Sequence, residues 1–126
     1  MSKLVYVPVS VGELFDKYTI LQIKKLKITD QLKLESVIKE IDFLKPFINE
    51  YNVDLEIVSE LSEVNLLLWN IEDKIREKER RKEFDEEFIQ LARNVYITND
   101  KRSQIKNKIN LLLNSCLTDI KSYEKY

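Results

Sequence analysis

The stretch that decides the fold class is residues 61–75, LSEVNLLLWNIEDKI. Its apolar positions recur at alternating steps of three and four residues: Leu61, Val64, Leu68, Ile71 and Ile75. This spacing gathers them on one face of an α-helix and is typical of the seam between two antiparallel helices. The stretch therefore predicts a long helix that begins after Asp54 and pairs with another helix.

Two helices are predicted before this stretch. A capping box formed by Ser10 and Glu13 predicts a first helix over residues 11–28, because the Ser10 hydroxyl can accept from the Glu13 amide while the Glu13 carboxylate returns to Ser10. The second helix follows a cap at Asp30, and Pro46 is expected to kink or end it.

Two more helices are predicted after it. Asp85 is a suitable cap for a fourth helix, and the turn-forming residues 98–100 (Thr-Asn-Asp) are expected to separate it from a fifth. Cys116 is expected to lie buried on the apolar face of that last helix. Residues 1–9 are rich in β-branched and aromatic side chains, which favours an extended arm. We predict one all-α domain over residues 1–126, with about five helices in an antiparallel bundle or hairpin arrangement and a short N-terminal extended arm over residues 1–9.

The composition excludes several classes of chemistry. The 126 residues include no His, one Cys and one Gly. Without His or a second Cys the chain has no Ser–His or Cys–His pair, no structural zinc site and no internal disulfide. One glycine is too few for a phosphate-cradling loop. We therefore expect no cofactor and no bound metal.

The charge balance gives little indication of a partner. The 21 basic and 22 acidic side chains nearly cancel, so the basic surface expected of a nucleic-acid-binding protein is absent from the total. No apolar run approaches the ~20 residues that span a bilayer. We expect a cytoplasmic protein that binds no nucleic acid and has no membrane span.

Two polar stripes at helical spacing are candidate binding surfaces. On the 61–75 helix the stripe consists of Asn65, Trp69, Glu72 and Arg76, and on the last helix of Asn99, Arg102, Lys106 and Asn110. A tryptophan face beside an arginine fork suits a planar, anionic ligand. The alternative is structural: Glu72 and Arg76 form a helix-surface pair, and Trp69 packs beside it.

A third candidate group lies in the first turn of the first helix and contains Gly12, Glu13, Asp16 and Lys17. Glycine is costly inside a helix, so Gly12 points to a close backbone approach or a ligand. The simpler interpretation is that Glu13 caps the helix and Asp16 favours its dipole.

Carboxylates on the third helix raise one enzymatic alternative. Helical nucleotide pyrophosphohydrolases hold Mg²⁺ with acidic side chains at such spacings. The match is poor, because the residues concerned do not reproduce the paired motif of those enzymes across two helices: Glu60, Glu63, Glu72 and Asp73.

Several segments together resemble a small uncharacterised bacterial and phage family, a domain of unknown function. They are residues 9–14 (VSVGEL) with Asp16-Lys17, residues 64–79, and residues 84–110 around Phe84-Asp85, Leu91-Ala92-Arg93 and Asn99-Asp100. The resemblance implies an association with surface-polysaccharide and glycosyltransferase genes, and it supplies no catalytic residues. Its motifs contain the following polar and small residues, which we take as candidate ligand-binding positions: Gly12, Glu13, Lys17, Asn65, Trp69, Glu72, Arg76, Arg93, Asn99, Asp100, Arg102 and Asn110.

Two functions of different classes follow. The first is a non-enzymatic helical interaction or accessory protein associated with surface-glycan biosynthesis, a homo-oligomer with a protein partner in that machinery. The second is a protein that binds a small phosphate- or sugar-nucleotide-type ligand, or a metal-dependent nucleotide pyrophosphohydrolase. A chorismate-mutase-like bundle also suits arginine and glutamate between helices, but no specific motif supports it.

Overall fold

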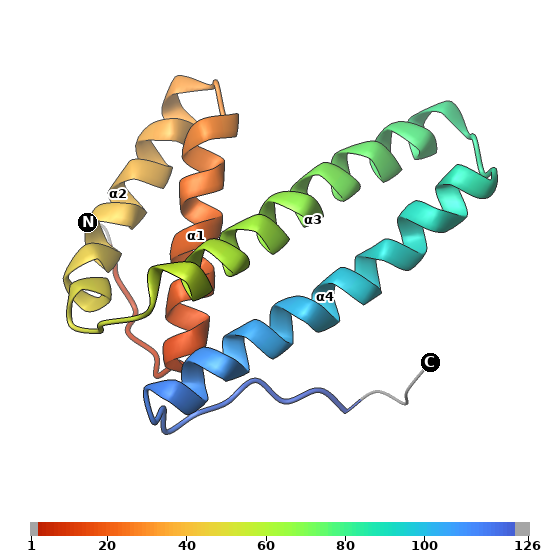
Figure 1. Cartoon of the computed structure of the whole chain (residues 1–126). Coiled ribbons are helices and arrows are strands. Elements are labelled where there is room, and N and C mark those ends of the chain that lie inside the picture. Colours follow the sequence, from red (N-terminus) through yellow and green to blue (C-terminus); the bar gives the residue numbers. More distant parts are fainter. Residues whose placement is uncertain (1–2, 123–126) are drawn as a thin grey trace.

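The computed structural model describes residues 3–122, which form two helical hairpins (Figure 1). The first hairpin consists of α1 (Val11–Lys27) and α2 (Gln31–Asn49), and the second of α3 (Leu55–Arg81) and α4 (Glu86–Leu112). Helix α1 packs against each of the other three helices, whereas α3 and α4 pack along one another. The described part of the chain contains no strand, so the predicted all-α class is confirmed.

The helices begin where the capping residues predicted them. Ser10 accepts a hydrogen bond from the Glu13 amide (3.0 Å), and Asp85 accepts one from the Phe88 amide (3.0 Å). Asp30 and Asp54 cap α2 and α3 in the same way. The second half of the predicted capping box does not form, because the Glu13 carboxylate binds a lysine of α4 instead.

The described residues contain four helices and not five. The predicted break at residues 98–100 is wrong, since α4 runs through it without interruption. Thr and Asn end helices when their side chains compete for backbone groups. Here Thr98 is buried in the assembled fold, and the Asn99 side chain accepts a hydrogen bond from Arg102 one turn farther along the same helix (3.4 Å), so neither side chain ends the helix.

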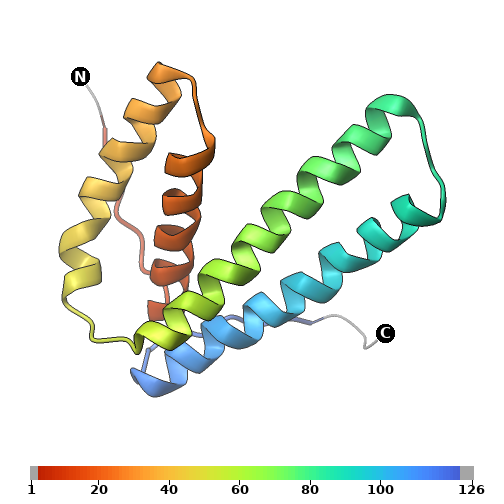
Figure 2. The same cartoon turned by 45° about the horizontal axis from the view of Figure 1, so that its top comes forward.

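The core consists of two apolar clusters, and α1 contributes side chains to both. One lies where α1 crosses the second hairpin and contains Phe15, Ile57, Leu61 and Ile109. The other lies between α1 and α2 and contains Leu21, Val37 and Ile41. Helix α1 therefore holds the two hairpins together. Beyond the crossing, the far half of the α3–α4 hairpin projects away from α1 and α2, as Figures 1 and 2 both show.

The segments at both ends of the described range lack regular structure. Residues 3–10 form neither helix nor strand. After α4 the chain reverses at Asn114, which has a left-handed backbone conformation (φ 53°), and residues 113–122 then return along α4 (Figure 1). Cys116 lies in this returning segment and is exposed, so the prediction that it is a buried helical thiol is wrong. The helix ends at Leu112, before it could carry Cys116 into the core.

Candidate functional site

A buried carboxylate joins three helices at the centre of the molecule. Asp16 of α1 is 1% exposed, and its two oxygens accept from the Arg102 guanidinium of α4 at 2.9 Å (Nε to Oδ1) and 2.5 Å (Nη2 to Oδ2). The Asn65 amide nitrogen of α3 donates to Asp16 Oδ1 at 2.9 Å. A bidentate arginine–carboxylate pair fixes relative orientation as well as distance. The crossing of α1 over the second hairpin is therefore locked at this point.

The groups around Asp16 satisfy one another. Thr19 Oγ1 accepts from the Asn65 amide (3.0 Å) and donates to the Asp16 carbonyl oxygen (2.8 Å). The hydrogen bond to Asp16 raises the pKa of the Arg102 guanidinium, although burial opposes this shift. No buried side-chain nitrogen or oxygen of residues 3–122 lacks a hydrogen-bond partner. Ligand binding at this centre would first have to displace one of these contacts.

A second group of charges lies one turn farther along α4. The Lys106 side chain is 7% exposed, and its Nζ lies 2.5 Å from Glu13 Oε2. The same nitrogen lies 3.9 Å from an Asp16 oxygen and 3.7 Å from an Asp119 oxygen. One buried ammonium therefore faces three carboxylates, which offsets the cost of removing it from water.

The first turn of α1 lies directly against α4. The Gly12 amide donates to Asn110 Oδ1 (2.6 Å), and the Val11 amide donates to Ser115 Oγ (3.1 Å). These amides have no partner within their own helix. A Cβ on Gly12 would collide with the main-chain carbonyl oxygen of Lys106. The close backbone approach inferred from Gly12 is confirmed, with α4 as the element that approaches.

The returning C-terminal segment is fastened to α4 by Asp119. Ser103 Oγ donates to the Asp119 carboxylate (2.5 Å), and the Asn107 side chain bonds both the amide (2.8 Å) and the carbonyl (2.7 Å) of Asp119. Burial opposes ionisation of Asp119, but Ser103 and Lys106 outweigh it and hold the pKa of this carboxyl below its usual range.

The structure brings together half of the candidate positions. The residues that contribute to this network are Gly12, Glu13, Asn65, Asn99, Arg102 and Asn110.

The other half lie outside it. Lys17 pairs with Glu40 on the surface (3.0 Å), and Arg76 pairs with Glu72 (3.1 Å) across one helical turn, as the structural alternative for this stripe proposed. The side chains of three candidates make no hydrogen bond or ion pair with other described residues: Trp69, which is half-buried, Arg93, which is exposed, and Asp100.

Five network residues belonged to none of the candidate groups: Thr19, Ser103, Asn107, Ser115 and Asp119. Asp16 and Lys106 had been placed in the polar groups with Gly12 and Arg102, and both contribute to the network. Asp119 carries no such signal, since its position depends on the reversal of the chain after α4.

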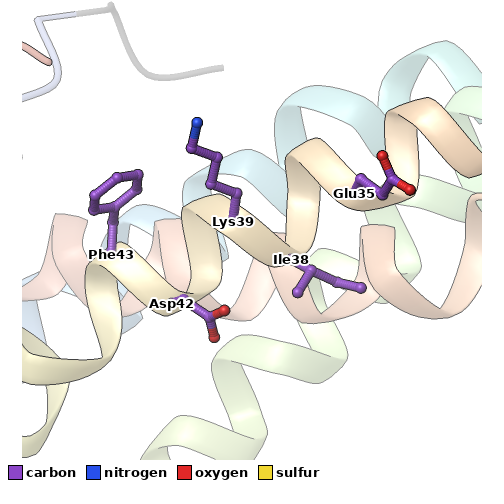
Figure 3. Close-up of a pocket in the computed structure, with 5 residues that line it drawn as sticks. All are labelled: Glu35, Ile38, Lys39, Asp42 and Phe43. Atoms are coloured by element: carbon purple, nitrogen blue, oxygen red, sulfur yellow. The ribbon is translucent and has the colours of Figure 1, made fainter. Parts of the chain in front are cut away.

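A surface hollow lies elsewhere, on α2. It is lined by five residues of that one helix, as Figure 3 shows: Glu35, Ile38, Lys39, Asp42 and Phe43. All five side chains are exposed, and none belongs to the network around Asp16. The hollow therefore lies on the outer face of a helix and is not enclosed between elements.

The described residues offer neither a metal-binding cluster nor a helix that could span a membrane. Among residues 3–122, no three acidic or cysteine side chains gather closely enough to hold a metal ion. Within the same residues, no helix combines the length and the apolar character that crossing a membrane requires.

Comparison with known proteins gives a family and nothing beyond it. Residues 5–126 match the model of a family of unknown function, DUF6165, and the chain belongs to this family. No curated protein and no solved structure gives a significant match.

Proposed function

We propose that this member of the DUF6165 family is a non-enzymatic helical interaction protein, and that the tip of its α3–α4 hairpin is the contact surface. The observation that carries the proposal is a pair of contacting aromatic rings at a tip held by salt bridges, with one ring exposed and the other half-buried. Phe84 and Phe88 contact edge to face with ring centres 5.1 Å apart, and Phe84 is 56% exposed. Aromatic side chains on projecting surfaces are typical of protein interfaces.

Salt bridges from one lysine hold the hairpin tip together. Lys78 Nζ lies 2.9 Å from Asp85 and 3.2 Å from both Glu83 and Glu87. The hydrogen bond to Asp85, followed by those to Glu87 and Glu83, raises the pKa of Lys78 above its usual range. One cation thus ties the end of α3 to the connecting loop and to the start of α4. A surface ordered in this way loses little conformational entropy when a partner binds.

The polar groups at the centre of the molecule support the same proposal. Asn65, Arg102 and Asn110 were candidates for ligand binding, and all three hold the helices to one another. A bound ligand or an enzymatic reaction would have to take these groups away from the fold. The alternative proposal, a phosphate- or sugar-nucleotide-type ligand or a metal-dependent pyrophosphohydrolase, therefore ranks second.

The partners follow from the sequence argument and the resemblance. We expect a cytoplasmic homo-oligomer in which the tip contributes to self-association. We also expect an enzyme of surface-glycan synthesis as the protein partner, because the resemblance implies that association.

Sedimentation equilibrium of the full chain at micromolar concentrations tests the surface. Wild type is expected to associate, and Phe84→Ser should weaken the association. Leu111→Ser is the matched control, since Leu111 is 83% exposed at the opposite end of α4. A wild-type chain that remains monomeric and binds no surface-glycan enzyme would contradict the proposal.

A thermal-shift panel separates the two functions. It contains Mg²⁺, Mn²⁺, nucleoside triphosphates, nucleotide sugars and simple dicarboxylates. A ligand at 100 times its Kd adds about 2.7 kcal/mol of stability, which corresponds to a rise in Tm of roughly 8–15 °C for a domain of this size. We expect no such rise; a clear one would favour the ligand-binding alternative and identify the ligand class.

A further inference from the structure

We propose that α4 carries a recognition site for an aspartate within an extended peptide, and that the C-terminal segment of the chain occupies this site as an exchangeable strap. The site, called here the aspartate cradle, consists of Ser103, Lys106 and Asn107. The strap is residues 116–122. The cradle and the hairpin tip lie toward opposite ends of α4, so the proposal does not depend on the function proposed for the tip.

The contacts in the cradle specify both a backbone and a side chain. Asn107 Oδ1 accepts from the Asp119 amide (2.8 Å), and Asn107 Nδ2 donates to the Asp119 carbonyl oxygen (2.7 Å). Paired bonds to the amide and carbonyl of a single residue are what a neighbouring β-strand supplies. Ser103 donates to the carboxylate, and Lys106 lies 3.7 Å from its other oxygen. An asparagine in place of the aspartate would lose the charge that Lys106 faces.

The cradle is held in place by contacts that do not involve the strap. Lys106 is bound by Glu13 at 2.5 Å. The Asn107 side chain also accepts from Asn110 (3.2 Å), and Asn110 in turn holds the Gly12 amide. These partners belong to α1 and α4, so Lys106 and Asn107 remain held when the strap leaves, whereas Ser103 loses its contact with Asp119. A preorganised site of this kind binds its ligand at low entropic cost.

The strap covers little apolar surface. Its apolar side chains face solvent, with Leu117 43% and Ile120 82% exposed, so little apolar surface is uncovered when it leaves. Ser115 fixes the start of the segment through the Val11 amide, and release therefore begins at the next residue. A tethered segment occupies its site at an effective concentration of the order of millimolar, which is sufficient for a weak site to be filled.

The ligand is therefore an extended segment with a central aspartate. We assign this segment to a second copy of this chain, whose own strap has the required sequence; a segment of another protein is the alternative outcome of the test. Both sources present the same chemistry to the cradle, and the experiment below distinguishes them.

Fluorescence anisotropy with a labelled peptide tests the site. The peptide has the sequence of residues 113–122 with Cys116→Ser, and it is titrated with full-length protein. Asp119→Lys in the protein should release the strap, because the new ammonium faces Lys106. We expect the opened protein to bind the peptide at least about tenfold more tightly than wild type, in which the tethered strap competes. Ile120→Lys is the control; it adds the same side chain at an exposed neighbouring position and should behave as wild type.

Three further variants make the result decisive. Asn107→Ala in the opened protein should abolish binding, and a peptide with Asp119→Asn should bind weakly. Asp119→Asn in the protein is a second opened variant, which retains the shape of the native side chain if the lysine disturbs folding. Circular dichroism verifies the helices of each protein. Absence of peptide binding to both folded, opened variants would overturn the proposal.

A mixing experiment identifies the source of the ligand. The Asn107→Ala chain has an intact strap and a broken cradle, whereas the Asp119→Lys chain has the reverse. A complex that forms only in the mixture supports exchange between copies of this chain. Peptide binding without such a complex supports a segment of another protein. Both experiments leave Phe84 unchanged, so a failure here is separate from a failure of the function proposed for the tip.

Discussion

Replacing Gly12 with alanine should destabilise the fold, although alanine is the better helix former. In an exposed helix interior the change from glycine to alanine stabilises by about 1 kcal/mol. At this position the added Cβ meets the carbonyl oxygen of Lys106 and lies 2.9 Å from Asn110 Oδ1. The first of these atoms belongs to the backbone of α4, so a side-chain rotation cannot relieve the contact. Helix α1 must move away from α4.

The size of the effect follows from what that movement breaks. Overpacking of a close-packed contact costs about 1–3 kcal/mol. Lengthening the 2.6 Å hydrogen bond from the Gly12 amide to Asn110 leaves a buried donor poorly paired, at a further cost of about 1–3 kcal/mol. After subtraction of the propensity gain, we expect a net loss of about 1–5 kcal/mol, centred on ~3 kcal/mol.

Urea unfolding followed by circular dichroism measures this loss directly. A fall in Tm of roughly 8–15 °C should accompany it. The control is Gln22→Ala, which removes a partly exposed side chain from the same helix and should change stability little. Because propensity and packing predict opposite signs, a Gly12→Ala chain as stable as wild type or more stable would refute the close contact between α1 and α4.

Three further outcomes are expected. Asp16→Ala should cost about 3–5 kcal/mol, because it leaves the Arg102 guanidinium without its carboxylate; adding Arg102→Met should recover part of this loss in a double-mutant cycle followed by urea unfolding. The folded-state pKa of Asp119 is lowered, so the contribution of this carboxylate to stability is complete above the unfolded pKa of about 3.9 and is lost as the pH falls through the folded pKa. The difference in unfolding free energy between wild type and Asp119→Asn should therefore be constant at neutral pH and shrink in acid. A difference that grows in acid would contradict this sign. Lys78→Met should accelerate amide hydrogen exchange in residues 79–88 and leave exchange around Asp16 unchanged, since its three partners all lie at the tip.

Features set by local interactions could be predicted from the sequence. The caps at Ser10, Asp30 and Asp85 form bonds within three residues, and the helices begin where these side chains indicate. The break predicted at residues 98–100 failed for the opposite reason. Its side chains favour a turn in isolation, but burial of Thr98 in the assembled fold prevents one.

Only part of the candidate site could be predicted. Periodicity shows which residues share one face of a helix, but not which other helix packs against that face. The stripe that begins at Asn65 does point toward α1, and Asn65 binds Asp16. Farther along α3 the same stripe passes beyond the crossing, where the second hairpin leaves α1 (Figures 1 and 2), and Arg76 there pairs only with Glu72 on the surface. The crossing point depends on long-range packing of the two apolar clusters, which the spacing of residues within one helix does not reveal.

Because α4 is continuous, a rotation at one point along the helix would be transmitted to its far end. The ion pair with Asp16 holds α4 at Arg102, whereas Phe88 lies in the first turn of the same helix, at the hairpin tip. Fourteen residues separate Arg102 from Phe88, a length of about 21 Å along a helix, so a rotation of ~10° about the clamp would carry Phe88 through roughly 4 Å. Had the chain turned at Thr98, such a rotation would have been absorbed there. In the continuous helix, a rotation about Arg102 would instead displace the hairpin tip, which is the contact surface that we propose.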